Sequence, residues 1–157
     1  MTENNQDLIA RYYATAAEEL NETILADKDL WYSYIVNLPE HLHIVYTIVV
    51  FHEQVFNGGL HQYFFNAYGQ FGYDTLENLR KINANESAVI LEKALNEVNN
   101  LKDGVGEFRS KVFNRKIGRI VDFDDDLGDY LNNLDQQYYS LDENLEKLMV
   151  NYINEAK

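Results

Sequence analysis

The chain has 157 residues, enough for one domain that buries a core without disulfides or metal ions. It contains 26 acidic and 13 basic residues, a formal net charge of −13, and no cysteine. Disulfides, thiolate metal sites and thiol nucleophiles are therefore excluded, and the negative charge disfavours direct binding to nucleic acid or anionic lipid. The polar, acidic start and the shortness of every apolar run predict a soluble, cytoplasmic single domain over residues 1–157 that does not cross a membrane.

Apolar residues recur at helical spacing from the start of the chain, which predicts an amphipathic helix over residues 9–24. A short aromatic-rich segment, residues 30–38, follows. Pro39 suits the first turn of a new helix, because its missing N–H is not needed there. Residues 40–57 are apolar nearly all round, which is typical of a helix enclosed by others. The β-branched run 44–50 leaves a buried strand open as the alternative, but its helical neighbours favour a central helix.

Glycines then mark the ends of further helices. After Gly58 and Gly59 a helix is expected to run to about Asn66, and after the next glycine turn Asp74 is expected to cap a helix that contains Leu76, Leu79 and Ile82.

A helix that starts near Asn85 should bury a stripe over residues 91–101. Residues 105–116 predict another helix, followed by a loop. Two more apolar stripes, 127–138 and 141–153, close the chain, the second behind a possible capping box of Ser140 and Glu143. The expected fold is all-α, a compact bundle of about seven or eight helices around the central apolar helix.

Polar groups lie beside aromatic residues in segment 53–66, which raises the question of an active site. The segment lacks a zinc-protease motif, because Phe56 stands where the second histidine belongs. A structural interpretation is favoured: two glycines permit a left-handed helix end, and nearby polar side chains hydrogen-bond the backbone groups freed there. The residues of this structural motif are Glu53, Asn57, Gly58, Gly59, His61, Gln62 and Asn66.

No metal or cofactor is expected. The four histidines lack a spacing that places two imidazoles over one ion. Asp122, Asp124 and Asp126 resemble the start of a calcium loop, but Leu127 and Asn133 occupy its glycine and glutamate positions. The sequence therefore predicts no catalytic residues and a protein that is not an enzyme.

The charge is uneven along the chain, with 102–121 at +4 and 122–157 at −8. The basic segment either neutralises acidic neighbours in the fold or, in a homodimer, pairs with acids across the interface. The acidic segment is the candidate surface for a basic partner. Its candidate residues, with three from the N-terminal helix if that helix lies alongside, are Asp122, Asp124, Asp125, Asp126, Asp129, Asp135, Asp142, Glu143, Glu146, Glu18, Glu19 and Glu22.

A set of residues over about 30–156 resembles a bacterial family of helical domains of unknown function that includes a dimeric DNA-mimic protein. The most specific part is the run 55–64 with Asn66, supported by Gly69 and by apolar positions within 79–94 and 123–153. Asn83 stands where the family has glycine, and Leu60 replaces a phenylalanine. The resemblance implies a homodimer whose acidic surface occupies the DNA-binding face of a transcription repressor.

Mimicry is physically reasonable, because duplex DNA carries one charge per roughly 1.7 Å of axis and acids one helical turn apart lie about 5–6 Å apart. We expect a basic or DNA-binding protein as the partner. The alternative is a helical protein-interaction or immunity-type module without DNA mimicry. Mimicry requires a continuous acidic stripe, an interaction module requires an apolar or tyrosine-rich patch, and an enzyme requires a pocket with convergent polar groups.

Overall fold

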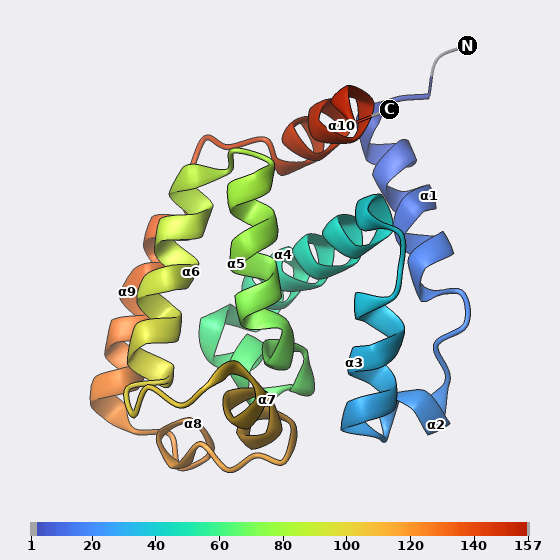
Figure 1. Ribbon diagram of the computed structural model, residues 1–157. Helices are drawn as coiled ribbons and strands as arrows, with labels where there is room; N and C mark the ends of the chain where they lie inside the picture. Colours follow the sequence, from blue (N-terminus) through green and yellow to red (C-terminus); the bar gives the residue numbers. More distant parts are fainter. Residues whose placement is uncertain (1–2, 157) are drawn as a thin grey trace.

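A computed structural model describes residues 3–156, and no part of this range is in a β-strand. The all-α prediction is confirmed, and the alternative of a strand at 44–50 is wrong. Figure 1 shows the arrangement of the elements, with bounds as follows: α1 Asn5–Ala17, α2 Glu22–Leu25, α3 Lys28–Val36, α4 Glu40–Phe65, the 3₁₀ helix η1 Ala67–Phe71, α5 Gly72–Lys81, α6 Asn85–Val98, α7 Val105–Phe113, α8 Gly118–Val121, α9 Asp125–Tyr139 and α10 Leu145–Glu155.

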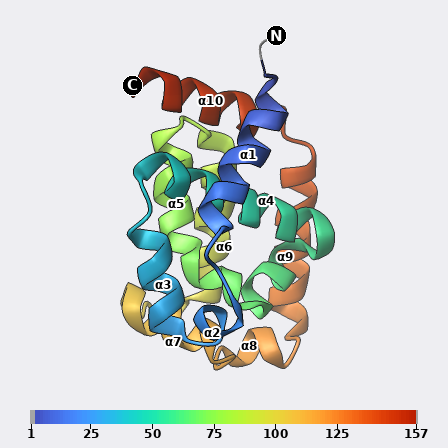
Figure 2. The same ribbon diagram turned by 90° about the vertical axis from the view of Figure 1, so that its right-hand side faces the viewer.

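Helix α4 lies at the centre, with α5, α6 and α9 on one side and α1 and α3 on the other (Figures 1 and 2). Its side chains are buried around most of its circumference; Ile44, Ile48 and Phe51 are fully buried. This agrees with the apolar pattern, because a helix enclosed by others has no face that needs to be polar.

The predicted interruption at Gly58 and Gly59 is present as a sharp bend within α4. Gly59 has φ 80° and ψ 177°, a backbone conformation that residues with a Cβ rarely adopt. Residues beyond it resume the helix as far as Phe65.

Two helix starts differ from the prediction. The stripe at 9–24 is divided, because α1 ends at Ala17 and the Asn21 side chain accepts a hydrogen bond from the Ile24 N–H, which begins the one-turn helix α2. Asp74 does not cap α5, because η1 leads directly into that helix at Gly72.

Three further differences lie in the second half of the chain. Leu101 is 74% exposed, because α6 ends at Val98. The expected loop after residue 116 contains the one-turn helix α8. Asn144 caps α10 through the Lys147 N–H, so the proposed capping box of Ser140 and Glu143 is wrong.

The buried apolar side chains form two clusters. The larger joins α4 to α5, α6, α9 and α10. The smaller holds α1 and α3 against α4 around Trp31, Tyr46 and Phe71, and the Trp31 indole donates to the Tyr46 hydroxyl over 3.2 Å. Within the described residues, no helix is both long and apolar enough to traverse a bilayer.

Candidate partner-binding surface

The start of α9 carries a group of exposed aspartates. Asp124 is the N-cap, its Oδ1 accepting from the Leu127 N–H at 2.8 Å, and Asp125 and Asp126 occupy the first turn. The positive end of the helix dipole favours negative charge at these positions. Asp122 and Asp129 are exposed beside them. The ion pairs formed within residues 3–156 include none of Asp122, Asp125, Asp126 and Asp129.

Within residues 3–156, the bases of segment 102–121 form ion pairs within the segment itself, with Glu97 of α6, and with Asp124 alone among the aspartates at the start of α9. Lys111 pairs with Asp103 and Glu107, and Arg119 lies 3.8 Å from Glu97 and 3.9 Å from Asp124. Arg109 stacks on the Tyr32 ring, with its Cζ 3.5 Å from the ring centroid. The prediction of neutralisation within the fold therefore holds for Lys111 and Arg119, while most of the α9 aspartates keep their charge unmatched.

Asp135 of α9, predicted above to lie on the acidic surface, is buried, and its side chain contacts the bend in α4. Its Oδ1 accepts from the Leu60 N–H at 2.8 Å, which satisfies a donor that the bend frees from the helix. A Cβ on Gly59 would lie 2.4 Å from its Oδ2. Burial raises the pKa of the Asp135 carboxyl, an effect that the hydrogen bond from Leu60 partly opposes.

The polar residues of segment 53–66 act differently from the prediction. Gln54, which the sequence analysis did not single out, accepts from the amides of Gln62 at 3.2 Å and Asn66 at 2.8 Å. His61 Nε2 lies 2.8 Å from the Ile120 carbonyl oxygen, and its ring stacks on Phe123. Asp135, rather than these side chains, receives the freed backbone N–H of Leu60.

Asn57 and Glu53 also fall outside the predicted role. Both are exposed, and the hydrogen bonds within residues 3–156 that satisfy the bend involve neither side chain. Glu53 instead lies on the wall of a groove described below.

Glu143 caps a helix that is distant in sequence. Its carboxylate accepts from the backbone N–H groups of Glu86 and Ser87 and from the Ser87 hydroxyl, at 3.0, 2.8 and 2.6 Å. These donors belong to the first turn of α6, whose own N-cap, Ala84, has no side-chain acceptor. The carboxylate is therefore occupied within the fold rather than free for a partner.

Asp142 and Glu146 lie at a groove between α1, α4 and the start of α10, the three elements seen together in Figure 2. The groove has a volume of about 600 Å³. Apolar side chains line it, with Ile48 and Met149 buried beneath its surface and Val49 and Leu141 partly exposed, and carboxylates lie around it. The acidic segment 122–157 is thus divided between the first turn of α9 and this groove, roughly 20 Å apart by the length of α9.

Glu18, Glu19 and Glu22 are exposed, but they do not extend the acidic surface of α9. They follow α1 and begin α2, which lies across α4 from α9 in Figure 1. The N-terminal helix packs on α10, within the acidic segment, but these three glutamates do not lie beside the aspartates of α9.

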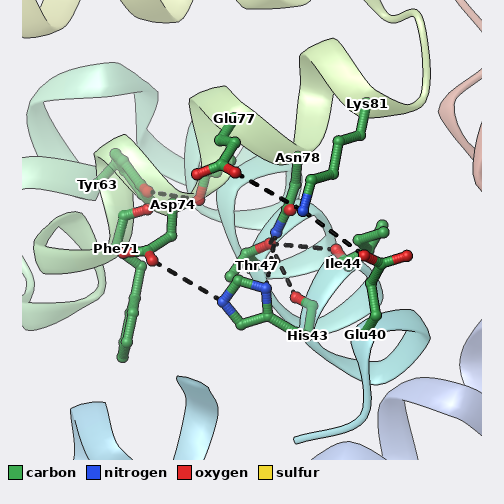
Figure 3. A network of polar contacts seen from close by, with 11 residues as sticks. Glu40, His43, Ile44, Thr47, Tyr63, Phe71, Asp74, Glu77, Asn78 and Lys81 are labelled. Carbon is green, nitrogen blue, oxygen red and sulfur yellow. Dashed lines mark hydrogen bonds and ion pairs between the residues drawn. The ribbon is translucent and has the colours of Figure 1, made fainter. Parts of the chain in front are cut away.

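A second polar group lies between α4 and α5 (Figure 3). The Asn78 amide donates to Thr47 Oγ1 at 2.9 Å and lies 3.1 Å from His43 Nδ1. The other ring nitrogen of His43, Nε2, faces Asp74 and lies 3.9 Å from its Oδ1. Burial lowers the pKa of His43 and raises that of Asp74. The network joins two helices through neutral hydrogen bonds, with Lys81 placed between Glu40 and Glu77 at its exposed end.

Among residues 3–156, no cluster of three or more His, Cys, Asp or Glu side chains is arranged to hold a metal ion. In a comparison with known families, the model of the DMP19-like protein family matches residues 36–156. The chain belongs to the DMP19-like family. Comparisons with curated proteins and with solved structures gave no match.

The family match covers the last residue of α3 and all of the elements from α4 to α10 of this DMP19-like chain. It includes the bend at Gly59, its acceptor Asp135 and the aspartates of α9. Helices α1 and α2 lie outside the matched range, although α1 packs on both α4 and α10.

Proposed function

We propose that the protein is an acidic binding protein and a DNA mimic, which occupies the DNA-binding face of a basic nucleic-acid-binding protein such as a transcription repressor. The observation that carries the proposal is a set of exposed aspartates at the start of α9, which form no ion pair within residues 3–156; they are Asp122, Asp125, Asp126 and Asp129. Membership of the DMP19-like family and the net charge of −13 support it. The proposed mechanism is binding, without catalysis.

The structure also limits the form of the mimicry. Beyond Asp129 the exposed face of α9 carries amides, Asn132, Asn133, Gln136 and Gln137, rather than acids. The acidic residues of segment 122–157 therefore form two separate groups and not the continuous stripe expected from the sequence, and we propose that mimicry uses the group at the start of α9 alone. A partner that covers the first group would place its phosphate-binding residues on the N-terminal turn of α9.

The test is capture of partners from a native lysate at low and high salt, followed by competition with DNA for each captured protein. We expect a DNA-binding protein that loses its DNA when held, and whose binding weakens with salt because both surfaces release counterions. A captured protein that keeps its DNA would rule out mimicry.

The variant Asp122→Asn, Asp125→Asn, Asp126→Asn, Asp129→Asn locates the surface. It retains Asp124, the N-cap, and should bind the partner about tenfold more weakly. The matched control, Glu18→Gln, Glu19→Gln, Glu22→Gln, Glu155→Gln, changes the net charge equally and should bind like the wild type. The family resemblance also implies a homodimer, so sedimentation of both variants must first show an unchanged oligomeric state.

A second candidate is a protein-interaction module without mimicry, which the exposed aromatic residues beside α9 favour. Phe123 is 64% exposed and has φ 54°, a strained conformation for a bulky residue, and Phe56 is 54% exposed. Exposed aromatic side chains are typical of binding surfaces. A partner released by Phe123→Ser but unaffected by the four asparagines would establish this alternative.

A further inference from the structure

The groove between α1, α4 and α10 combines an apolar interior with a negative border. Ile9, Ile48 and Met149 are buried in its walls, and its volume of about 600 Å³ is within the range of ligand-binding pockets. Such a concave apolar surface differs in chemistry from the aspartates at the start of α9, and it needs a separate explanation.

The carboxylates at the groove are not neutralised inside the protein. Among the described residues that line it, none is lysine or arginine. The ion pairs formed within residues 3–156 do not include Glu53, Asp142 or Glu146, whereas Glu143 is held by the first turn of α6. His52 also lines the groove, and burial lowers its pKa, which favours the neutral ring.

This charge arrangement selects the kind of occupant. A neutral apolar ligand would remove water from the carboxylates without supplying a hydrogen-bond donor or a positive charge, which costs free energy. An anionic ligand would be repelled. A cation with apolar groups satisfies both parts of the surface, because its apolar atoms replace water over the interior and its charge faces the carboxylates.

The length of the concave surface indicates a polypeptide rather than a small amine. A smaller cavity of about 120 Å³ shares His52, Leu141 and Leu145 with the groove. This cavity continues to Phe56 and Tyr139, which are partly exposed and whose ring centroids lie 5.0 Å apart. The concave surface thus extends from α1 to an aromatic pair at the end of α9.

We propose that this groove binds a basic amphipathic helix of a partner protein. Its apolar side chains would lie over the half-buried Tyr13, Val49 and Leu141, and its lysine or arginine side chains would lie toward Glu53, Asp142 and Glu146. Helix-in-groove recognition has this form, with apolar anchors at i, i+3, i+4 and i+7. The inference rests on the proposed function in that it names a second contact made by the basic partner. Family membership alone does not predict this site, because α1, which forms one wall, lies outside the family match.

The test uses a synthetic peptide of about 14 residues, roughly four helical turns, with leucine at the anchor positions and lysine elsewhere. Binding is measured by fluorescence anisotropy and by NMR of the Val49 and Leu141 methyl groups, which lie at the surface of the groove. Three further probes are a scrambled peptide of the same composition, a leucine–glutamate peptide and n-octylamine. We expect the leucine–lysine helix to shift both methyl signals and the two control peptides to leave them unchanged.

Two exposed alanines on α1 offer a matched pair of variants. Ala10 lines the groove and Ala14 does not. Ala10→Lys should weaken binding of the peptide by about tenfold, because the new ammonium occupies the carboxylate border, while Ala14→Lys should change it by less than about twofold.

A second pair of variants tests the border without adding a side chain to the groove. Glu53→Gln with Glu146→Gln should lower the affinity and its salt dependence more than Glu18→Gln with Glu19→Gln, which makes the same change in net charge across α4.

Several results would overturn the proposal: equal binding of the scrambled peptide, silent methyl signals, or equal effects of the two alanine variants. Methyl shifts with n-octylamine but not with the helix would replace it with a site for small amphiphilic amines. The outcomes separate the two proposals. If binding of a captured repressor is weakened by the four asparagine substitutions at α9 but not by Ala10→Lys, the mimicry proposal is supported and the groove proposal is contradicted. Peptide binding in the groove without any DNA-binding partner does the reverse.

Discussion

At the scale of single residues, the bend in α4 depends on Gly59 and Asp135. The positive φ of Gly59 turns the helix, and the Asp135 carboxylate accepts the Leu60 N–H that the turn leaves without a helical partner. The space that a side chain at residue 59 would need is already filled by that carboxylate. Each residue therefore makes a separate and testable contribution to stability.

Gly59→Val should destabilise the protein by about 2–4 kcal/mol, because a β-branched residue is strained at φ 80° and its Cβ collides with Asp135. Chemical denaturation measures the change. The control is Gly128→Ala, which lies inside α9 with no atom within 4 Å of the added Cβ and should be stabilising by up to about 1 kcal/mol. Equal stability of Gly59→Val and wild type would show that the bend is not constrained.

Asp135 should make stability depend on pH in a defined direction. Its folded pKa is raised above 3.8, so the folded state holds a proton more tightly than the unfolded state. Stability relative to Asp135→Asn should therefore be greatest below pH 3.8 and decline as the pH rises through the folded pKa. The comparison with asparagine isolates this residue from the other carboxylates.

The hydrogen bond of Asp135 can be separated from its charge. Asp135→Asn retains an acceptor for the Leu60 N–H and should be as stable as wild type or more so at pH 7. Asp135→Ala should lose about 1–3 kcal/mol, because the buried N–H is left without a partner. Denaturation curves for the two variants that coincide would contradict this account.

At the scale of helices, α6 receives its cap from outside. Ala84 stands at its N-cap and offers no acceptor, and Glu143, in the link between α9 and α10, supplies one. The start of α6 is thus fastened to a segment that also borders the groove. The Glu143 carboxylate therefore connects the start of α6 to the link between α9 and α10.

Glu143→Ala should cost about 1–2 kcal/mol and should accelerate hydrogen exchange at Glu86 and Ser87 more than elsewhere in α6. Asp142→Ala is the control; Asp142 is exposed, and its removal should leave exchange in α6 unchanged. Protection of Ser87 that survives in Glu143→Ala would mean that another group caps the helix.

The elements also show where sequence reasoning succeeds and fails. The central helix and its interruption at Gly59 were predictable, because composition and glycine placement are local signals. Asp135 was misassigned by charge counting, although its position, four residues after Leu131 and three before Tyr138, lies on the buried stripe of α9. The role of Glu143 had no local signal in the sequence. Its carboxylate accepts hydrogen bonds from the backbone of Glu86 and Ser87, which precede it by 57 and 56 positions.

At the scale of the whole molecule, charge is the dominant property. The net charge of −13 and the unpaired aspartates of α9 produce self-repulsion in the folded state. Added salt should therefore stabilise the protein at neutral pH, because screening weakens that repulsion. We expect the thermal midpoint to rise between about 20 mM and about 300 mM salt, where the Debye length shortens severalfold.

The control for this salt effect is the same measurement near pH 4.6, the isoelectric point. Net repulsion is absent there, and the midpoint should respond much less to salt. A midpoint at neutral pH that stays constant or falls with salt would show that local ion pairs, such as those of Lys111 and Arg119, outweigh the overall charge.

The bend at Gly59 also has a consequence for the order of folding. Leu60 and Asp135 are 75 residues apart, so the acceptor for the bend does not exist until α9 has left the ribosome and docked. The first turns of α4 can form early through contacts between neighbours in sequence, but its last turn must wait for almost the entire chain. The most central helix of the molecule is therefore among the last to be completed during synthesis.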